Sequence, residues 1–134
     1  MSAATAIGAP TALSGPPIDS TANVLYKGQQ FEVRITALFE SWLDGLRDRQ
    51  GRARMLDRFR RLGDGNFGNA KAVGEGVHEL RMDFGPGYRA YFINRDGRLI
   101  LLLCGGDKSS QRRDIALARE MAKGEFDGIQ DQGA

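Results

Sequence analysis

The sequence predicts a single α+β domain, with a largely antiparallel four-stranded sheet, two helices after the first strand and a further helix at the C-terminal end. Two observations support this. A chain of 134 residues, of which 41% are hydrophobic, is long enough for one core. Its apolar periodicities follow the order strand, two helices, three strands, one helix, and this segregation is typical of α+β domains.

The first part of the domain is expected to contain one strand and two helices. Apolar and charged residues alternate in Gln30–Ile35, which indicates a strand with one buried face. Thr36 can cap a helix whose apolar stripe ends near Leu46. A second helix is expected over about Arg52–Leu62, and Gly63 is a natural residue for its C-terminal end.

The second part is expected to hold three strands in a meander. The glycine-rich segment Gly63–Gly76 has no regular period, which indicates a loop. Strands are expected over Val77–Phe84, Tyr88–Asn94 and Arg98–Cys104, joined by short turns. Leu99–Leu103 is apolar at every position, as in a central strand that is covered on both faces.

The two ends of the chain differ from the middle. Residues 1–25 lack apolar periodicity, so we expect a disordered extension whose deletion leaves the thermal stability nearly unchanged. Residues 26–124 form the expected domain, in which Ser109 or Ser110 caps a last helix with Ile115, Ala118 and Met121 on its inner side. Residues 125–134 are expected to be a flexible acidic tail.

Composition restricts the compartment and the partners. The net charge is +2, but residues 31–124 hold 18 lysines and arginines against 13 acidic residues. A basic domain favours a polyanionic partner such as nucleic acid. No apolar run reaches the roughly 18–20 residues of a membrane span, and one cysteine forms no internal disulfide, so we expect a cytoplasmic protein without a membrane partner.

The hairpin Glu79–Phe92, ELRMDFGPGYRAYF, holds the main candidate site. Side chains alternate between the faces of a strand, so if the Gly-Pro-Gly turn keeps register, one face packs on helices. The other face then presents a polar patch of Glu79, Arg81, Arg89 and Tyr91. Guanidinium groups suit phosphate oxygens and a tyrosine can stack on a base, so the patch suits RNA. The alternative is a set of cross-strand ion pairs with Asp83 on a solvated surface.

Other reactive or charged residues have competing interpretations. Helical spacing forms a basic stripe, either RNA-binding or simply solvated, from Arg54, Arg58 and Arg61. His78 is the only histidine, and it shares the apolar parity of Leu80, which favours a packed residue over an acid–base role. Cys104 ends a buried strand and is expected in the core rather than as a nucleophile. No His, Cys or carboxylate spacing suggests a metal site.

Four motifs occur together in a characteristic order: GNFGNAK, ELR, GPGYR and GGDKSSQ. Over about Phe31 to Lys123 the sequence closely resembles the addiction-module killer proteins of the RelE/ParE toxin superfamily, the HigB-like or phage Gp49-like branch. The resemblance implies a small RelE-like α+β toxin of a type II toxin–antitoxin system. It also implies a helix-turn-helix antitoxin as partner, in a possible hetero-oligomer.

The resemblance leaves the target open. Many members of the superfamily are endoribonucleases that cleave mRNA on the ribosome without a metal or other cofactor, so translation is the expected target. The alternatives are a non-enzymatic toxin that inhibits DNA gyrase and a degenerate toxin that acts as a co-repressor with its antitoxin. Fold similarity does not choose between these functions.

Candidate site residues follow from the same resemblance. Arg89 falls where the RNA-cleaving members carry a strand arginine that contacts phosphate, and Arg81 and Lys108 fall near two further basic positions. Glu79 stands where some relatives have lysine, and is expected either to act as a base or to pair with Arg81. Independently of the resemblance, the candidate RNA-binding residues are Arg54, Arg58, Arg61, Tyr91, Arg112 and Arg113. The chain departs from the RNase branch after Ser110, because it has Gln111 to Ile115 where that branch often has a tyrosine or histidine.

Overall fold

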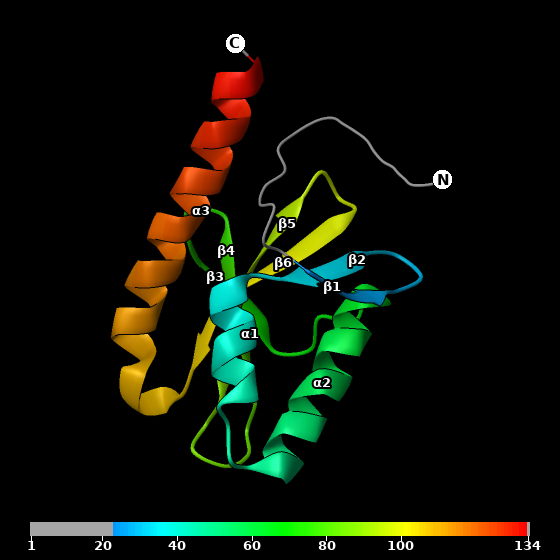
Figure 1. Cartoon of the computed structure of the whole chain (residues 1–134), viewed down its shortest axis with the longest axis vertical. Coiled ribbons are helices and arrows are strands. Elements are labelled where there is room, and N and C mark those ends of the chain that lie inside the picture. The colour runs from blue at the N-terminus through cyan, green and yellow to red at the C-terminus, as the bar shows by residue number, and fades with distance from the viewer. Residues whose placement is uncertain (1–22, 134) are drawn as a thin grey trace.

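The computed structural model describes residues 23–133, with side chains for residues 23–124. In chain order the elements are β1 (Asn23–Lys27), β2 (Glu32–Ile35), α1 (Ala37–Asp44), α2 (Arg49–Gly63), β3 (Ala70–Gly74), β4 (Val77–Arg81), β5 (Arg89–Arg95), β6 (Leu99–Gly106), the 3-10 helix η2 (Lys108–Ser110) and α3 (Gln111–Gly133). Helices α1 and α2 lie over one face of the sheet and α3 lies over the other (Figure 1).

The sheet confirms the α+β class but differs from the expected four-stranded sheet. It has six strands in the order β1-β2-β6-β5-β4-β3. Strands β4, β5 and β6 form the predicted antiparallel meander, whereas β2 and β6 are parallel, so the sheet is mixed. The two strands missed by the sequence are the edge strands β1 and β3. Both are short and mostly exposed, so neither has the apolar alternation that marks a half-buried strand.

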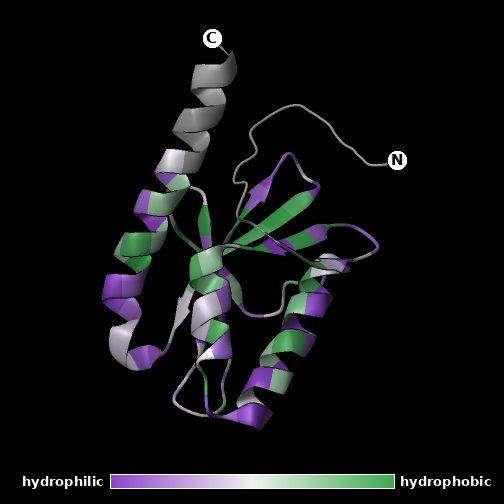
Figure 2. Ribbon diagram, viewed as in Figure 1, coloured by the Kyte–Doolittle hydropathy of each residue, from purple (hydrophilic) through white to green (hydrophobic). Residues whose placement is uncertain are grey.

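Strand β6 lies in the middle of the sheet and is buried from both sides, as its uninterrupted apolar sequence predicted. Ile100 and Leu102 belong to the core under α1 and α2, while Leu101 and Leu103 belong to the core under α3. In Figure 2 the hydrophobic colour accordingly gathers on the central strands, whereas hydrophilic and hydrophobic residues alternate along α2 and along the coloured part of α3. The sheet therefore has no solvated face along this strand.

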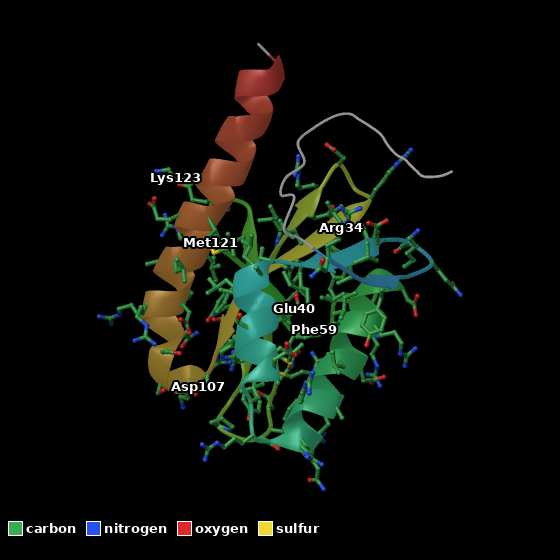
Figure 3. All side chains as sticks on the ribbon, in the orientation of Figure 1. Arg34, Glu40, Phe59, Asp107, Met121 and Lys123 are labelled. Carbon is green, nitrogen blue, oxygen red and sulfur yellow. The ribbon has the colours of Figure 1, made fainter. Side chains whose placement is uncertain are left out.

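Hydrogen bonds at the helix ends explain where the helices begin. The hydroxyl of Thr36 accepts from the N–H of Phe39 at 3.0 Å, which confirms the predicted cap of α1. Helix α2 begins three residues earlier than expected, at Arg49, because Asp48 accepts from the N–H of Gly51 at 2.9 Å. It ends at Gly63, as predicted. Phe59 of α2, which Figure 3 labels, packs edge-on against Phe39 of α1, with ring centroids 5.5 Å apart.

The last helix begins differently from the expectation. Asp107, at the end of the chain segment that leads from β6 (Figure 3), caps η2 in a reciprocal capping box with Ser110. Ser109 and Ser110 are therefore not the N-cap, and α3 continues directly from η2 at Gln111. Ala118 is buried, and Ile115 and Met121 pack around it against the sheet, as predicted.

The domain limits stay a prediction, but two elements cross them. Strand β1 begins at Asn23, inside the segment expected to be disordered, and residues 1–22 lie outside the described part. Helix α3 runs on to Gly133, through residues that the sequence assigned to a flexible tail.

Removal of the first half of β1 should therefore lower the stability of the protein. From the sequence alone, deletion of residues 1–25 was expected to leave the thermal stability nearly unchanged. Leu25 packs against the core, and Asn23 donates to the carboxylate of Glu40 at 2.8 Å. A chain that starts at Tyr26 should be less stable than one that starts at Asn23, by about 1–2 kcal/mol. Urea denaturation of the two chains measures this difference. Equal midpoints would show that β1 contributes nothing before Tyr26.

Candidate functional site

The candidate site begins with the register of the β4–β5 hairpin. Arg81 is the cross-strand partner of Arg89, and Glu79 is that of Tyr91. The Gly-Pro-Gly turn allows this pairing because Gly85 and Gly87 adopt positive φ angles of 58° and 78°. All four polar residues therefore share one face of the sheet, as the sequence predicted.

The expectation that this face presents an open patch is wrong. Glu79 and Tyr91 are fully buried, and Arg89 is only 6% exposed. The reason is that α3 covers this face, with Tyr91 packed in the same core cluster as Ala118 and Ala122. Tyr91 therefore has no exposed ring for stacking on a base, and only Arg81 of the four reaches solvent.

A buried hydrogen-bond network surrounds the Glu79 carboxylate. Its Oε2 accepts from the Tyr91 hydroxyl at 3.0 Å and from Nε2 of Gln111 at 2.8 Å. Burial raises the pKa of the Tyr91 phenol well above its ordinary value, and the charge of Glu79 raises it further. Tyr91 thus stays a protonated donor at physiological pH. Gln111, which sequence reasoning did not single out as a site residue, joins α3 to the strands.

Two atoms of this cluster are buried without a hydrogen-bond partner among the described residues: Oε1 of Glu79 and Nε of Arg89. Buried polar atoms are nearly always paired in folded proteins. The two side chains carry opposite charges, yet no ion pair joins them within 4.0 Å. Arg89 therefore keeps donor capacity that the fold does not use.

The first turn of α3 has its own buried polar contacts. The Ser110 hydroxyl donates to Oδ2 of Asp114 at 2.5 Å, and the Cys104 thiol donates to the Asp114 carbonyl at 3.6 Å. Burial raises the pKa of the Cys104 thiol to about 12. A thiol in this state is a poor nucleophile, in agreement with its predicted place in the core.

Exposed cations lie along the rim of this cluster. Lys108 lies against the Gly-Pro-Gly turn, because its N–H donates to the Pro86 carbonyl at 3.4 Å. Arg112 and Arg113 are exposed at the start of α3. Arg113 is 4.0 Å from the Asp114 carboxylate, whereas Arg81, Arg89, Lys108 and Arg112 form no ion pair with any residue from 23 to 124. Apart from Arg113, the cations of this rim therefore have no acidic partner within residues 23–124.

The arginine stripe on α2 lies on the opposite side of the sheet from this cluster. The Arg54 guanidinium stacks over the Phe84 ring at 4.6 Å, and Arg61 pairs with Asp57 at 3.1 Å. Arg58 reaches the end of β4, where Nη2 donates to the Arg81 carbonyl at 3.5 Å. The three arginines thus lie apart from Arg89. Of the three, Arg58 contacts β4, through its bond to the Arg81 carbonyl.

The remaining candidates are structural. His78 stacks on Phe92, with ring centroids 5.5 Å apart, on the side of α2. This contact confirms the interpretation of His78 as a packed residue. Among the described side chains, those of residues 23–124, no cluster of His, Cys, Asp and Glu could hold a metal ion.

A second hydrogen bond that the sequence did not predict ties the hairpin to α2. The Tyr88 hydroxyl donates to Oδ2 of Asp48 at 2.9 Å, and the Tyr88 ring packs edge-on against Trp42. The Gly51 N–H, and after it the Tyr88 hydroxyl, hold the pKa of Asp48 below its ordinary value of 3.8. This bond holds Tyr88 at the end of the Gly-Pro-Gly turn, and the Pro86 carbonyl of the same turn accepts from the Lys108 N–H.

Replacement of Tyr88 with phenylalanine should destabilise the protein in a pH-dependent way. A carboxyl group whose pKa is lowered by folding stabilises the folded state at pH values above its unfolded-state pKa. This stabilisation is lost as the pH falls through the folded-state pKa. The stability difference between Tyr88→Phe and wild type should therefore be present at about pH 7 and shrink by about pH 3. Urea denaturation at both pH values measures it, and a difference that does not change with pH would contradict the role of Asp48.

Together, the fold and the site define a small α+β protein in which a helix covers a buried carboxylate beside a rim of mostly unpaired cations. Residues 41–123 match the family described as phage derived protein Gp49-like (DUF891), so the chain belongs to this family. A protein of Haemophilus influenzae described as uncharacterized is 46% identical over 92 residues, which cover 69% of this chain and 93% of that relative. No solved structure matches the chain.

Membership of this family indicates a general functional context. The Gp49-like family is associated with toxin–antitoxin, or addiction, modules, and membership of such a toxin-like family implies an antitoxin partner. Among the described residues, no helix combines the length and the apolar character that a membrane span requires.

Proposed function

We propose that this protein is the toxin of a type II toxin–antitoxin pair and acts as a ribosome-dependent mRNA endonuclease of the RelE/ParE, HigB-like kind. The observation that carries the proposal is the cross-strand pair Arg81 and Arg89, which has no acidic partner among the described residues. Like charges directly opposite one another destabilise a sheet. A phosphate group would neutralise this pair, and Lys108, against the adjoining Gly-Pro-Gly turn, and Arg112, at the start of α3, are further exposed cations.

The chemistry of RNA cleavage assigns roles to these cations. Cleavage requires deprotonation of the ribose 2′-OH, stabilisation of the charge that develops on the phosphate, and protonation of the leaving 5′-oxygen. Arg89 is proposed to contact the scissile phosphate, because its guanidinium forms planar paired hydrogen bonds with phosphate oxygens. Arg81 and Lys108 are proposed to hold the neighbouring backbone phosphates.

The exposed arginines extend this proposed surface. Arg112 and Arg113 are exposed in the first turn of α3, directly after Gln111, and we assign to them contacts with the RNA backbone beside the scissile bond. The stripe of Arg54, Arg58 and Arg61 lies farther away, and we assign to it contacts with ribosomal or messenger RNA. The proposed partner in the resting state is a helix-turn-helix antitoxin that covers the cations.

Mapping of RNA 5′ ends tests the proposal. The purified protein is added to one mRNA, either alone or engaged by translating ribosomes, and the ends are mapped by primer extension. We expect new 5′ ends within the translated region and none on the mRNA alone. Expression in cells should stop growth, and co-expression of the antitoxin should restore it.

Either of two results would contradict the proposal and favour another function. If no new ends appear while plasmid supercoiling changes in cells that make the protein, DNA gyrase is the better target. If soluble protein changes neither RNA nor supercoiling and growth is normal, the protein is not an active toxin, and a co-repressor role with the antitoxin becomes the better assignment.

A further inference from the structure

The contact between Gln111 and Glu79 joins two parts of the candidate site that are distant in the sequence. Gln111 is the first residue of α3, and its Nε2 donates to Oε2 of Glu79 on β4 at 2.8 Å. Glu79 is fully buried and Gln111 is half-buried, so the bond is largely withdrawn from water. A hydrogen bond to a charged group in such surroundings is stronger than one on the surface.

The bond of Gln111 also affects two exposed cations, because Gln111 lies between Lys108 and Arg112 in the chain. Lys108 begins η2, which leads directly into Gln111, and Arg112 follows it. The other link from this segment to the hairpin is longer, since the Lys108 N–H is 3.4 Å from the Pro86 carbonyl. Of these two hydrogen bonds from the helical turn of Lys108 and Arg112 to the hairpin, the bond of the Gln111 amide is the shorter, and it is the one made to a carboxylate.

Glu79 itself is poorly placed for proton transfer to a substrate. It has no exposed surface, and its Oε2 already accepts two hydrogen bonds, from Tyr91 and Gln111. A general base must come within hydrogen-bond reach of the proton that it removes. The carboxylate therefore faces the protein rather than a substrate.

We infer that Gln111 is a positioning residue, which holds Lys108 and Arg112 beside Arg81 and Arg89 through its hydrogen bond to the buried carboxylate of Glu79. The inference rests on the proposed function for its catalytic consequence, but the positioning is a property of the folded chain. It assigns to Glu79 the role of an anchor, in place of the role of a base.

An exchange of the two side chains separates an anchor from a base. In the double variant Glu79→Gln with Gln111→Glu, the same pair of groups can form the hydrogen bond with donor and acceptor reversed. Both wild-type bonds end on Oε2 of Glu79, so the amide nitrogen at position 79 takes the place of that oxygen. One of its hydrogens then bonds to the carboxylate at position 111, and the other bonds to the Tyr91 hydroxyl oxygen, which becomes the acceptor. The carboxylate has moved from the strand to the helix, so a base at position 79 is lost while the attachment of the turn is kept.

The experiment compares wild type, Gln111→Ala, Gln111→Glu and the double variant. One readout is amide hydrogen exchange in residues 108–114, and the other is the rate of RNA cleavage on translating ribosomes. Gln50→Ala is the matched control, because Gln50 is exposed on α2. We expect Gln111→Ala to lower both the exchange protection and the cleavage rate about tenfold, as for one lost hydrogen bond to a charged group.

The Gln111→Glu variant should lose more than Gln111→Ala, because two carboxylates then face each other in a buried site. The double variant should recover both readouts to within about threefold of wild type. Unchanged exchange in Gln111→Ala would overturn the inference. So would a double variant that recovers protection but not cleavage, since the carboxylate would then be needed at position 79 itself.

The two readouts keep this inference distinguishable from the proposed function. Hydrogen exchange needs no RNA, so it reports on the attachment of the turn whatever the target is. If the exchange responds as expected while the wild type cleaves no RNA, the positioning is supported and the nuclease proposal fails.

Discussion

Replacement of Arg89 with methionine is expected to lower the rate of RNA cleavage about a hundredfold, which corresponds to roughly 3 kcal/mol of lost transition-state stabilisation. The reason is the proposed contact between its guanidinium and the scissile phosphate. Methionine is preferred to alanine because Arg89 is only 6% exposed, and a truncated side chain would leave a cavity beneath α3. The measurement is the rate at which new 5′ ends appear on ribosome-bound mRNA.

A matched control separates the local effect from a general loss of positive charge. Arg98 is exposed in the turn between β5 and β6, so Arg98→Met removes the same charge far from Arg89. It should leave the rate within about twofold of wild type. The prediction fails if Arg89→Met folds with an unchanged melting temperature and still cleaves at the wild-type rate.

The substitution Gly28→Ala should lower the free energy of unfolding by about 3 kcal/mol or more. A Cβ atom at Gly28 would lie 2.3 Å from the carbonyl carbon and oxygen of Gly63, where the turn after β1 meets the end of α2. Backbone atoms cannot rotate away as a side chain can. The Gly63 carbonyl also accepts from the N–H groups of Gln30 and Phe31 at 2.9 and 2.8 Å, so its displacement would weaken both bonds.

Gly124→Ala provides the control for this substitution. Gly124 lies in α3, and a Cβ atom added there would have no heavy atom of the described residues within 4 Å beyond its own helix backbone, so alanine meets no obstacle. A glycine-to-alanine change inside a helix stabilises it by up to about 1 kcal/mol. Urea denaturation should therefore separate the two variants clearly. A Gly28→Ala protein as stable as Gly124→Ala would show that the close approach of the two chain segments can relax at little cost.

Local patterns were sufficient for much of the fold. The spacing of apolar residues along the two strands placed Arg81 and Arg89 on one face of the hairpin, because such spacing acts over a few residues. Edge strands were missed for a physical reason. Strand β3, with the sequence AKAVG, is short, mostly exposed and paired on one side only, so its sequence lacks the apolar alternation of a half-buried strand. The parallel pairing of β2 with β6 brings together segments that no local pattern connects.

The candidate site was predicted in composition but not in exposure. Alternation along β4 and β5 shows which residues share a face, but it does not show whether a distant helix covers that face. The bond between Glu79 and Gln111 joins residues 32 positions apart, and each side chain alone resembles an ordinary polar residue. The absence of a tyrosine or histidine after Ser110 was an available signal, but it applied to the whole segment Gln111 to Ile115 and not to Gln111 in particular.

The place of β6 between β2 and β5 also determines when the sheet can be completed during synthesis. Glu32 pairs with Leu99, so β2 has no inner neighbour until the ribosome has made residues 99–106. Pairing between segments so distant in the chain forms slowly, and synthesis itself proceeds at about 5–20 residues per second. The hairpin with Arg81 and Arg89 can form earlier, but Gly106, the neighbour of Arg89 across the next strand pair, arrives only near the end. A growing chain therefore has no complete site until most of it has been translated.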